Sequence, residues 1–295
     1  HRDLHSFPTR RSSDLSLHGW LQWQETLHSK QIDLGLERVS KVFQLLEKPV
    51  NRPLTITVGG TNGKGSSVAF LDAILRQSGY RVGSYTSPHL LSYNERIKIN
   101  GIVVRDELIC QAFERIEAVR GATSLSYFEF CTLAALDIFA RAKLDVQLLE
   151  VGLGGRLDAV NIIDADVTLI PSIGIDHSDW LGDTRELIAQ EKMGIFRSRR
   201  PAVVGDIDPP AIMETYSREL NTPLYLVGKD FSYEKNDDDW TWSNDTDTLT
   251  HLPHPNLLGQ HQMGNAAAVL QVLSLLSPRL PLTEQAIVDG LRQVQ

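Results

Sequence analysis

A glycine-rich run, GGTNGKGSS, extends from Gly59 to Ser67 and follows an apolar stretch, Leu54 to Val58, that is typical of a buried parallel strand. Small residues let backbone N–H groups converge on an anion, and a helix that begins after the run presents the positive end of its dipole. The lysine of the run can neutralise the terminal phosphates of a nucleotide. We therefore predict a phosphate-binding loop whose nucleotide contacts are Thr61, Asn62, Gly63, Lys64, Gly65 and Ser66.

The run departs from the strict P-loop pattern at both ends. Val58 stands where the first glycine belongs, and Gly65 follows the lysine directly. The alternative is a turn that only packs a helix against a sheet, but the order of strand, turn and helix (67–77, closed by Gly79) favours phosphate binding. Because Gly65 lacks the hydroxyl that normally binds magnesium, we expect at least one metal ligand from elsewhere in the chain.

Strand-like runs alternate with helical patterns along most of the chain. This alternation predicts an α/β fold, with a mostly parallel, doubly wound sheet and helices on both faces. Ligands of such sheets bind beyond the carboxyl ends of the strands. The expected strands are 54–58, 81–85, 146–150, 167–171, 202–204 and 224–227, and the expected helices are 36–46, 67–77, 106–119, 127–142, 184–196 and 209–220.

The alternation stops at residues 231–255, an acidic stretch with two tryptophans. It predicts a small peripheral β-hairpin or meander. Two further helical patterns follow, at 265–276 and 283–292.

Composition narrows the class of protein. At 295 residues and 42% hydrophobic, the chain can bury a sizeable core, and its length allows about two domains. A net charge of −8 without a long Lys/Arg stripe argues against nucleic-acid binding. No apolar run approaches the ~20 residues that span a bilayer. We expect a cytoplasmic protein without membrane contact, whose two cysteines, Cys110 and Cys131, are reduced and structural.

The first fifteen residues, HRDLHSFPTRRSSDL, show no periodicity and no initiator methionine. We interpret residues 1–15 as a non-native or disordered leader and exclude them from the fold. The expected folded unit is 16–295.

Five motifs in a fixed order resemble the folylpolyglutamate synthase family, relatives of the Mur cell-wall ligases. They are GTNGKGS, YTSPHL (85–90), LLEVGLGGRLDAVN (148–161), IDHSDWLG (175–182) and EKMGIF (191–196). Two further segments, IDLGLERV (32–39) and SLSYFEF (124–130), are similar to bifunctional dihydrofolate synthase and folylpolyglutamate synthase of proteobacteria.

The resemblance implies an ATP-dependent carboxylate–amine ligase of folate biosynthesis with ATP and Mg²⁺ as cofactors. It would add L-glutamate to 7,8-dihydropteroate, giving dihydrofolate, and to reduced folates through an acyl phosphate, as a monomer. The family continues into a second α/β domain that these 295 residues lack, so the ATP-binding, Mur-ligase-like unit 16–295 is expected to be inactive alone. Two alternatives remain, a Mur-type cell-wall ligase and a nucleotide-binding fragment without turnover.

Three residues match magnesium ligands of the family. Glu150 ends an apolar strand, where a carboxylate needs a metal or a partner, and the alternative is a salt bridge with Arg156. Ser87 supplies a hydroxyl after another strand, but it could equally be a turn or N-cap serine. His177 follows a third strand, although a single histidine is more often structural.

The resemblance also assigns Lys192 as a carbamylated lysine, which with Lys64 and His177 completes the expected catalytic set. The alternative is an ordinary lysine paired with Glu191 or Glu186. Asn265 matches an asparagine that contacts ATP, and otherwise is an ordinary polar residue in the first turn of a helix.

Substrate contacts come from three segments of the family pattern. The aromatic pair among them could stack on a planar pterin, or could simply belong to the core. The expected residues are Asp33, Leu34, Gly35, Leu36, Ser126, Tyr127, Phe128, Glu129, Leu157, Asp158 and Ala159.

Overall fold

The computed structural model describes residues 15–28, 33–48, 51–259 and 261–294. The expected leader, 1–15, lies outside this part of the chain apart from Leu15, which packs against the core. Ile32 of the IDLGLERV segment is also outside it. Ser16 caps the first described helix, α1 (Leu17–Leu27), with its hydroxyl.

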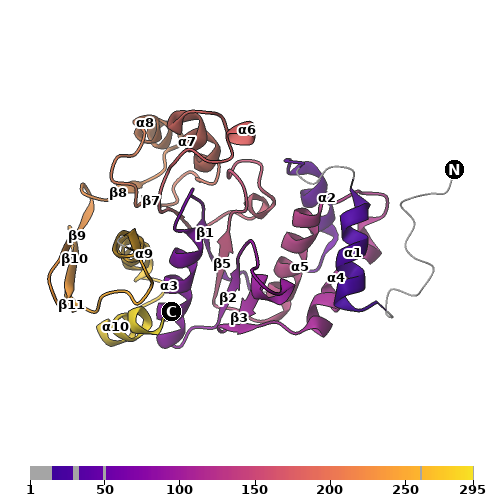
Figure 1. Cartoon of the computed structure of the whole chain (residues 1–295), viewed down its shortest axis with the longest axis horizontal. Coiled ribbons are helices and arrows are strands. Elements are labelled where there is room, and N and C mark those ends of the chain that lie inside the picture. The colour runs from indigo at the N-terminus through magenta and orange to yellow at the C-terminus, as the bar shows by residue number, and fades with distance from the viewer. Residues whose placement is uncertain (1–14, 29–32, 49–50, 260, 295) are drawn as a thin grey trace.

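A mostly parallel sheet forms the centre of the molecule (Figure 1). In the described chain its eight strands have the order β4-β3-β2-β5-β1-β6-β7-β8, and only β3 and β4 run antiparallel to their neighbours. The strands are β1 (Leu54–Val58), β2 (Val82–Tyr85), β3 (Ile97–Ile99), β4 (Ile102–Val103), β5 (Val146–Glu150), β6 (Val167–Ile170), β7 (Ala202–Val204) and β8 (Leu224–Leu226).

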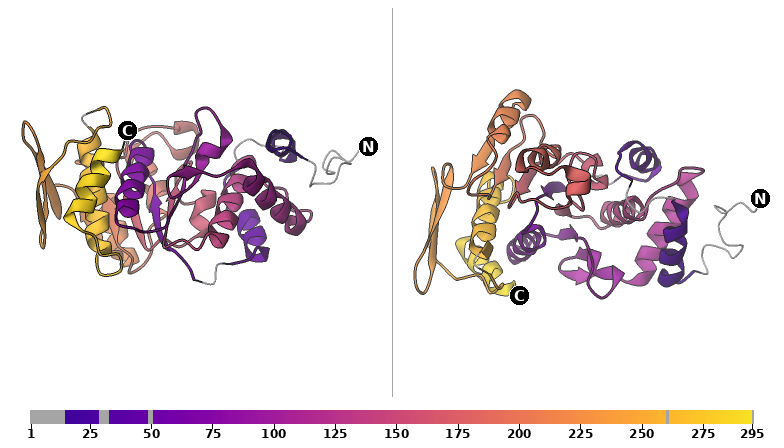
Figure 2. Two further views of the ribbon diagram at one scale, coloured as in Figure 1. Left: turned by 90° about the horizontal axis from the view of Figure 1, so that it is seen from below. Right: turned by 45° about the horizontal axis from the view of Figure 1, so that its top comes forward.

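Helices cover both faces of this sheet, which confirms the predicted doubly wound α/β class (Figures 1 and 2). One face carries α1, α2 (Glu37–Leu45), α4 (Asp106–Arg120), α5 (Tyr127–Arg141), α7 (Arg185–Met193) and α8 (Ile212–Leu220). The other carries α3 (Lys64–Gln77), α9 (His261–Leu276) and α10 (Glu284–Gln293). None of the helices in the described ranges is long and apolar enough to cross a membrane.

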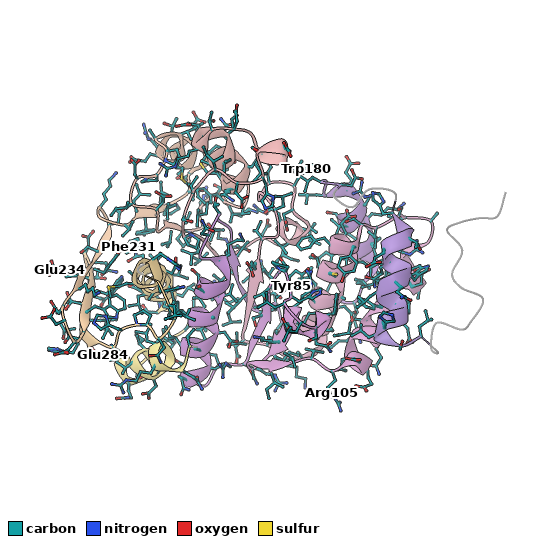
Figure 3. All side chains as sticks on the ribbon, viewed as in Figure 1. Tyr85, Arg105, Trp180, Phe231, Glu234 and Glu284 are labelled. Atoms are coloured by element: carbon teal, nitrogen blue, oxygen red, sulfur yellow. The ribbon has the colours of Figure 1, made fainter. Side chains whose placement is uncertain are left out.

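Central strands are buried on both faces. In β5, Leu148 packs toward α3 and α9, whereas Leu149 packs toward α5. On neighbouring β2, Tyr85 points to the α5 face, where its hydroxyl lies 3.3 Å from that of Thr132 (Figure 3). A strand with two buried faces reads as a continuous apolar run, which is why the sequence predicted β1 and β5 with their observed bounds.

Helix α3 begins at Lys64, three residues before the predicted start at Ser67. Gly63 adopts the left-handed conformation (φ 82°), so the turn ends there and the helix can begin with the next residue. Because Gly65 has a low helix propensity, the sequence-based prediction placed the first residue of this helix too late. The early start places Lys64, Gly65 and Ser66 in the first turn.

A second, three-stranded antiparallel sheet confirms the predicted peripheral meander. It consists of β9 (Phe231–Lys235), β10 (Trp240–Asn244) and β11 (Thr248–Leu252), and lies outside α9 in Figures 1 and 2. Trp240 and Trp242 of β10 are fully buried.

The sequence did not predict α1, β3 or β4.

Both cysteines have free thiols, as expected for reduced structural residues. Cys131 is fully buried in α5, and burial raises the pKa of its thiol to about 11. Cys110 of α4 is partly buried, and its thiol pKa is likewise raised to about 11 by desolvation. Both thiols are therefore protonated and unreactive near neutral pH.

We predict that Gly290→Ala destabilises the protein. A Cβ atom at Gly290 of α10 would lie 2.6 Å from the Cα atom of Ile74 in α3 and 2.8 Å from its backbone nitrogen, and backbone atoms cannot rotate away. Helix propensity favours alanine by about 1 kcal/mol, but overpacking costs about 1–3 kcal/mol. The free energy of unfolding, measured in urea, should therefore fall.

The matched control is Gly264→Ala in α9. Its Cβ atom would lie 3.3 Å from the hydroxyl oxygen of Tyr233, at the movable end of a side chain. This variant should unfold at the same urea concentration as the parent chain or at a higher one. Equal stability of the two variants would contradict the close contact between α10 and α3.

Candidate active site

The loops after four neighbouring strands meet at one edge of the sheet. Strands β2, β5, β1 and β6 are adjacent and parallel, so their carboxyl ends point the same way. They lead into the loop containing Ser87, the loop after Glu150, the phosphate loop, and the segment that reaches His177. This arrangement is what the sequence analysis expected of the four segments.

The phosphate loop is held rigidly against the segment after β6. Thr61 donates its N–H to the Ser172 carbonyl at 2.9 Å, and its hydroxyl oxygen lies 3.0 Å from both the carbonyl and the N–H of Gly174. Asn62 donates its N–H to the Ser172 hydroxyl, which donates back to the Asn62 carbonyl, both at 3.0 Å. These bonds hold the loop in a single, preformed conformation.

Lys64 curls back over this loop. Its Nζ donates to the carbonyl oxygens of Gly60 and Thr61, at 2.9 and 3.1 Å. The first N–H groups of α3, which starts at Lys64, have no partner within the helix. Together they form a positive cradle of the kind that binds phosphate groups.

Asn265 closes the cradle from the side of α9. A Cβ atom at Gly63 would lie 2.5 Å from Asn265 Oδ1, so glycine is required there. Asn265 is buried and donates to Gln262 Oε1 at 3.0 Å. It lies in the second turn of α9, because the helix begins at His261, earlier than expected. The structure thus places Asn265 against the predicted nucleotide loop.

Glu150 and Ser87 lie together. The Ser87 N–H donates to Glu150 Oε2 at 3.1 Å. Burial raises the pKa of the Glu150 carboxyl to about 7, although the Ser87 bond and the positive charges of Lys64 and Arg96 oppose this rise. Arg156, the partner that the alternative interpretation gave to Glu150, instead pairs with Glu191 at 2.8 Å, so the structure contradicts that alternative.

His177 caps the short helix α6 (Ser178–Leu181) with a left-handed backbone (φ 51°). Its ring is 56% exposed and its Nε2 lies 3.6 Å from the Asp176 carboxylate. Within the described ranges, no three His, Cys, Asp or Glu side chains are close enough to hold a metal ion by themselves.

The donors present nevertheless fit magnesium. A buried carboxylate and a hydroxyl are the oxygen ligands that this ion prefers, and it commonly completes its shell with water and phosphate oxygens. Glu150 and Ser87 would supply the oxygens, and His177, which lines the same cavity as Ser87, would add a nitrogen. The ion would neutralise the charge of bound phosphates.

Lys192 is 3% exposed in α7. Burial lowers the pKa of its ammonium to about 8, and the positive charge of Lys64 lowers it further, whereas Asp176 opposes the shift. Among the described residues no carboxylate pairs with Lys192. Glu191 pairs with Arg156, and Glu186 is exposed in the first turn of α7, so the ordinary pairing considered above is not seen.

One cavity of about 450 Å³ collects most of the predicted site. It extends from the phosphate loop to the N-termini of α2 and α5. The predicted residues that line it are Lys64, Ser87, His177, Asp33, Leu34, Gly35, Ser126, Phe128, Glu129, Leu157, Asp158 and Ala159. Pro88, Arg96, Gly152 and Leu153 line it without having been predicted. The predicted residues that are not among its lining residues are Leu36, Tyr127, Glu150, Lys192, Asn265, Thr61, Asn62, Gly63, Gly65 and Ser66.

Only one of the two candidate stacking residues faces this cavity. Phe128 lines it and lies directly over Gly152, where an added Cβ atom would be 2.6 Å from the ring. Tyr127 packs edge-on against Tyr93, with ring centroids 6.3 Å apart. Phe128 is therefore the side chain placed to stack on a planar ligand.

Asp158 organises the loop that forms one wall. Its carboxylate accepts from the N–H groups of Gly152, Leu153 and Val160 at 2.9–3.0 Å, and it caps the short helix η3 (Ala159–Ile162). Full burial raises the pKa of this carboxyl to about 6, while the three bonds oppose the rise. The oxygens of Asp158 are thus largely used by the protein itself.

Comparisons with known proteins agree with this geometry. The Mur ligase middle domain family matches residues 58–273. A dihydrofolate synthase/folylpolyglutamate synthase of Escherichia coli (strain K12) is 46% identical over 275 residues, 93% of this chain and 64% of that protein. The chain belongs to the dihydrofolate synthase/folylpolyglutamate synthase family.

Solved structures of this synthase family superpose closely on the chain. E. coli FolC in complex with DHPP and ADP gives a TM-score of 0.90 at 45% identity, covering 97% of this chain and 67% of that one. A bifunctional enzyme with Mn, AMPPNP and L-glutamate bound gives 0.87 at 45% identity, covering 98% and 68%. This synthase-family chain therefore spans about two thirds of the length of its relatives.

Sequence reasoning also missed an arginine that organises the synthase site. Arg38 of α2 binds Asp33 Oδ2 with Nη1 at 2.6 Å and Glu129 Oε1 with Nη2 at 3.2 Å. Glu129 also accepts from the Ser126 N–H at 2.7 Å as part of the capping box of α5. Arg38 therefore fastens the Asp33 loop to α5, and no local sequence pattern reveals a contact across 91 residues.

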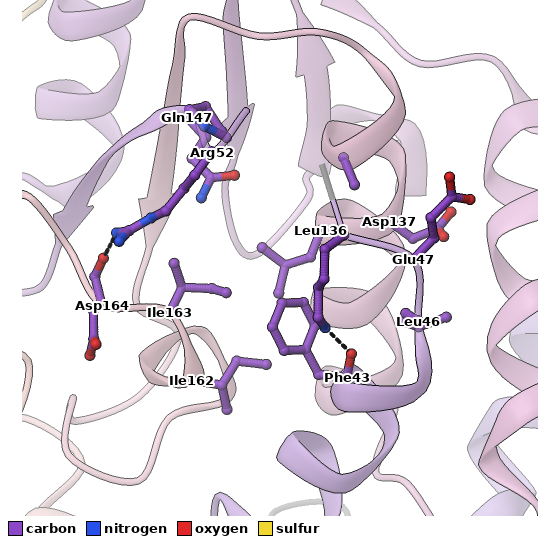
Figure 4. A pocket seen from close by; sticks show the side chains of 13 residues that line it. Phe43, Leu46, Glu47, Arg52, Leu136, Asp137, Gln147, Ile162, Ile163 and Asp164 are labelled. Carbon is purple, nitrogen blue, oxygen red and sulfur yellow. Dashed lines mark hydrogen bonds between the residues drawn. The ribbon is translucent and has the colours of Figure 1, made fainter. Parts of the chain in front are cut away.

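A second cavity, of about 320 Å³, lies at the amino ends of the strands (Figure 4). Apolar side chains such as Phe43, Ile162 and Ile163 dominate its wall. Its charged residues are already paired, with Arg52 bonded to the Asp164 carbonyl and Asp137 to Arg115 and Arg141. It lacks the convergent polar groups that distinguish the cavity at the carboxyl edge.

We predict that magnesium affinity depends on the ionisation of Glu150. The ligand must be deprotonated to bind, so below its pKa of about 7 the affinity should fall about tenfold per pH unit. Glu150→Gln should bind magnesium weakly and with little pH dependence. Calorimetry with a non-hydrolysable ATP analogue between about pH 6 and 8 measures both effects.

The matched control is Glu186→Gln on the exposed face of α7. It removes the same charge without touching the cavity and should keep the parent behaviour. A Glu150→Gln protein with the affinity and pH profile of the parent would exclude Glu150 as a ligand.

Proposed function

We propose that this chain carries the ATP and magnesium site of a ligase that adds L-glutamate to 7,8-dihydropteroate and to reduced folates. The observation that carries the proposal is one cavity whose wall includes the phosphate-loop Lys64 and the candidate stacking residue Phe128, together with Ser87 and His177. The ligands named for the solved relatives, DHPP with ADP and AMPPNP with Mn and L-glutamate, support the same pairing of sites.

The chemistry explains why these two sites must adjoin. A carboxylate does not react with an amine until its oxygen becomes a good leaving group. In the proposed reaction the substrate carboxylate attacks the γ-phosphorus of ATP, the bond to the β-phosphate oxygen breaks, and ADP leaves. The amine of glutamate then attacks the acyl phosphate, inorganic phosphate departs, and the amine loses a proton.

Positioning and charge neutralisation are the main tasks of the protein in such a reaction. Lys64, now bonded to its own loop, would exchange those carbonyls for the terminal phosphates. Phe128 would hold the flat ring of the substrate, and the preformed loop would fix the nucleotide. Magnesium, held by Glu150, Ser87 and His177, would offset the charge that accumulates on the phosphates.

Carbamylation of Lys192 fits the same scheme. A neutral amine adds carbon dioxide and loses a proton, which converts a positive side chain into a negative one. A pKa of about 8 leaves part of the Lys192 population neutral near physiological pH, unlike an ordinary lysine. The change would remove the repulsion between Lys192 and Lys64 and create an oxygen ligand.

We further propose that the protein is a cytoplasmic monomer that binds neither nucleic acid nor membrane. Its net charge of −8 disfavours association with phosphate backbones and anionic lipids. Light scattering during size exclusion measures the oligomeric state directly.

We predict that Lys64→Ala abolishes detectable ATP binding, because it removes the cation that closes over the phosphates. Calorimetry with ATP and magnesium is the measurement. Lys229→Ala, which removes an exposed lysine paired with Glu214, is the control and should bind as the parent does. Unchanged nucleotide affinity in Lys64→Ala would disprove the phosphate-loop assignment.

The activity itself is tested by product formation. The 295-residue chain is assayed alone and fused to the part of the E. coli relative that it does not cover. We predict that the fusion releases ADP only when dihydropteroate and glutamate are both present, and that it makes dihydrofolate. The chain alone should bind nucleotide without forming dihydrofolate, because the acyl phosphate must be shielded from water.

Three outcomes would contradict this prediction. Dihydrofolate formation by the chain alone at the rate of the fusion would show that these residues suffice. A fusion that binds nucleotide but never makes dihydrofolate would favour the nucleotide-binding alternative. ADP release with a cell-wall precursor and an amino acid would favour the Mur-type ligase.

A further inference from the structure

Arg96 is a buried cation that the proposed reaction does not yet use. It is the last residue of the short helix η2 (Tyr93–Arg96), next to β3. Only 8% of the residue is exposed, yet it lines the 450 Å³ cavity together with Lys64 and Ser87. Burying a charged guanidinium costs free energy unless an anion pairs with it, so the burial of Arg96 at the cavity wall indicates a function.

The guanidinium is fixed on one side and open on the other. Its Nε donates to His89 Nδ1 at 2.7 Å. Its central carbon lies 5.9 and 5.8 Å from the ring centroids of Tyr93 and Tyr127, which favours the charge and restrains the plane. No described residue accepts a hydrogen bond from Nη1 or Nη2. The two terminal nitrogens therefore form an unused fork of donors at the cavity wall.

The carboxylates around the cavity do not fill this fork. Asp33 and Glu129 are bound by Arg38, and Asp158 by three backbone N–H groups. Glu150 accepts from Ser87, and within the described ranges it makes no ion pair with Arg96. The intended partner of Arg96 is therefore an anion that comes with a ligand.

Lys64 cannot serve that ligand as well. Its Nζ lies on the phosphate loop, where a nucleotide would engage it. His177, the remaining basic residue of the wall, already faces Asp176 and the expected metal. Arg96 is thus the lining cation left for the organic substrate.

We propose that Arg96 binds the carboxylate of the pterin substrate through Nη1 and Nη2 and holds it facing the γ-phosphate. This inference rests on the proposed function. A planar guanidinium matches a carboxylate in a bidentate pair, which fixes orientation as well as position. It also reduces the repulsion between the two anions that must meet before the carboxylate oxygen attacks phosphorus. Arg96 is then a catalytic residue of the first step.

The test compares two ligands on variants of the chain. The ligands are dihydropteroate and its neutral primary carboxamide, each titrated by calorimetry with ADP present. A charge-assisted bond of this kind corresponds to about a 10- to 100-fold preference for the carboxylate. We expect the parent chain to show this preference, Arg96→Gln to lose it, and Arg96→Lys, which keeps the charge without the fork, to retain part of it.

The matched control is Arg38→Gln, which removes the other arginine near the cavity. Because Arg38 fastens the Asp33 loop rather than facing the open wall, this variant should weaken both ligands equally. ADP affinity and thermal unfolding report whether each variant is folded. If Arg96→Gln does not fold, the reduced preference of Arg96→Lys decides the question.

Failure of the inference differs from failure of the proposed function. A parent chain that binds neither pterin would contradict the function and this inference with it. A parent chain that prefers the carboxylate, with the same preference in Arg96→Gln and Arg96→Lys, would overturn the role of Arg96 and leave the function intact.

Discussion

The alignment of four parallel strand ends determines everything else about this site. Because β2, β5, β1 and β6 are neighbours, the loops that follow them must share one edge, although they are far apart in sequence. Hydrogen bonds between Thr61, Ser172 and Gly174 then lock two of these loops together. Without this register, a phosphate loop and a carboxylate such as Glu150 would have no reason to adjoin.

Burial of charged side chains shifts the pKa values of acids and bases in opposite directions. Desolvation raises the carboxyl pKa values of Glu150 and Asp158 to about 7 and 6, and lowers the ammonium pKa of Lys192 to about 8. Such shifts bring three groups to ionisation near neutral pH. A cation beside Glu150 would favour its ionised form, and carbamylation would replace the buried positive charge of Lys192 with a negative one.

The sequence predicted local features well and tertiary pairs poorly. Strands β1, β5 and β7 have their predicted bounds, because strands buried on both faces read as apolar runs between turns. The short edge strands β3 and β4 lack that signal. Glu150 was placed correctly at a strand end, whereas the alternative pairing with Arg156 is contradicted, since Arg156 turns toward Glu191. Arg38 and Arg96 escaped notice because their neighbours come from distant segments.

The contact between α3 and the two last helices affects how the protein folds. The phosphate-binding helix is made early, yet its outer face is covered by α9 and α10, with Gly290 seated on Ile74. During synthesis the apolar residues of α3 are therefore not fully covered until more than 200 further residues have been added. Forming a contact between such distant segments slows folding, and the apolar face of α3 stays exposed until the contact forms.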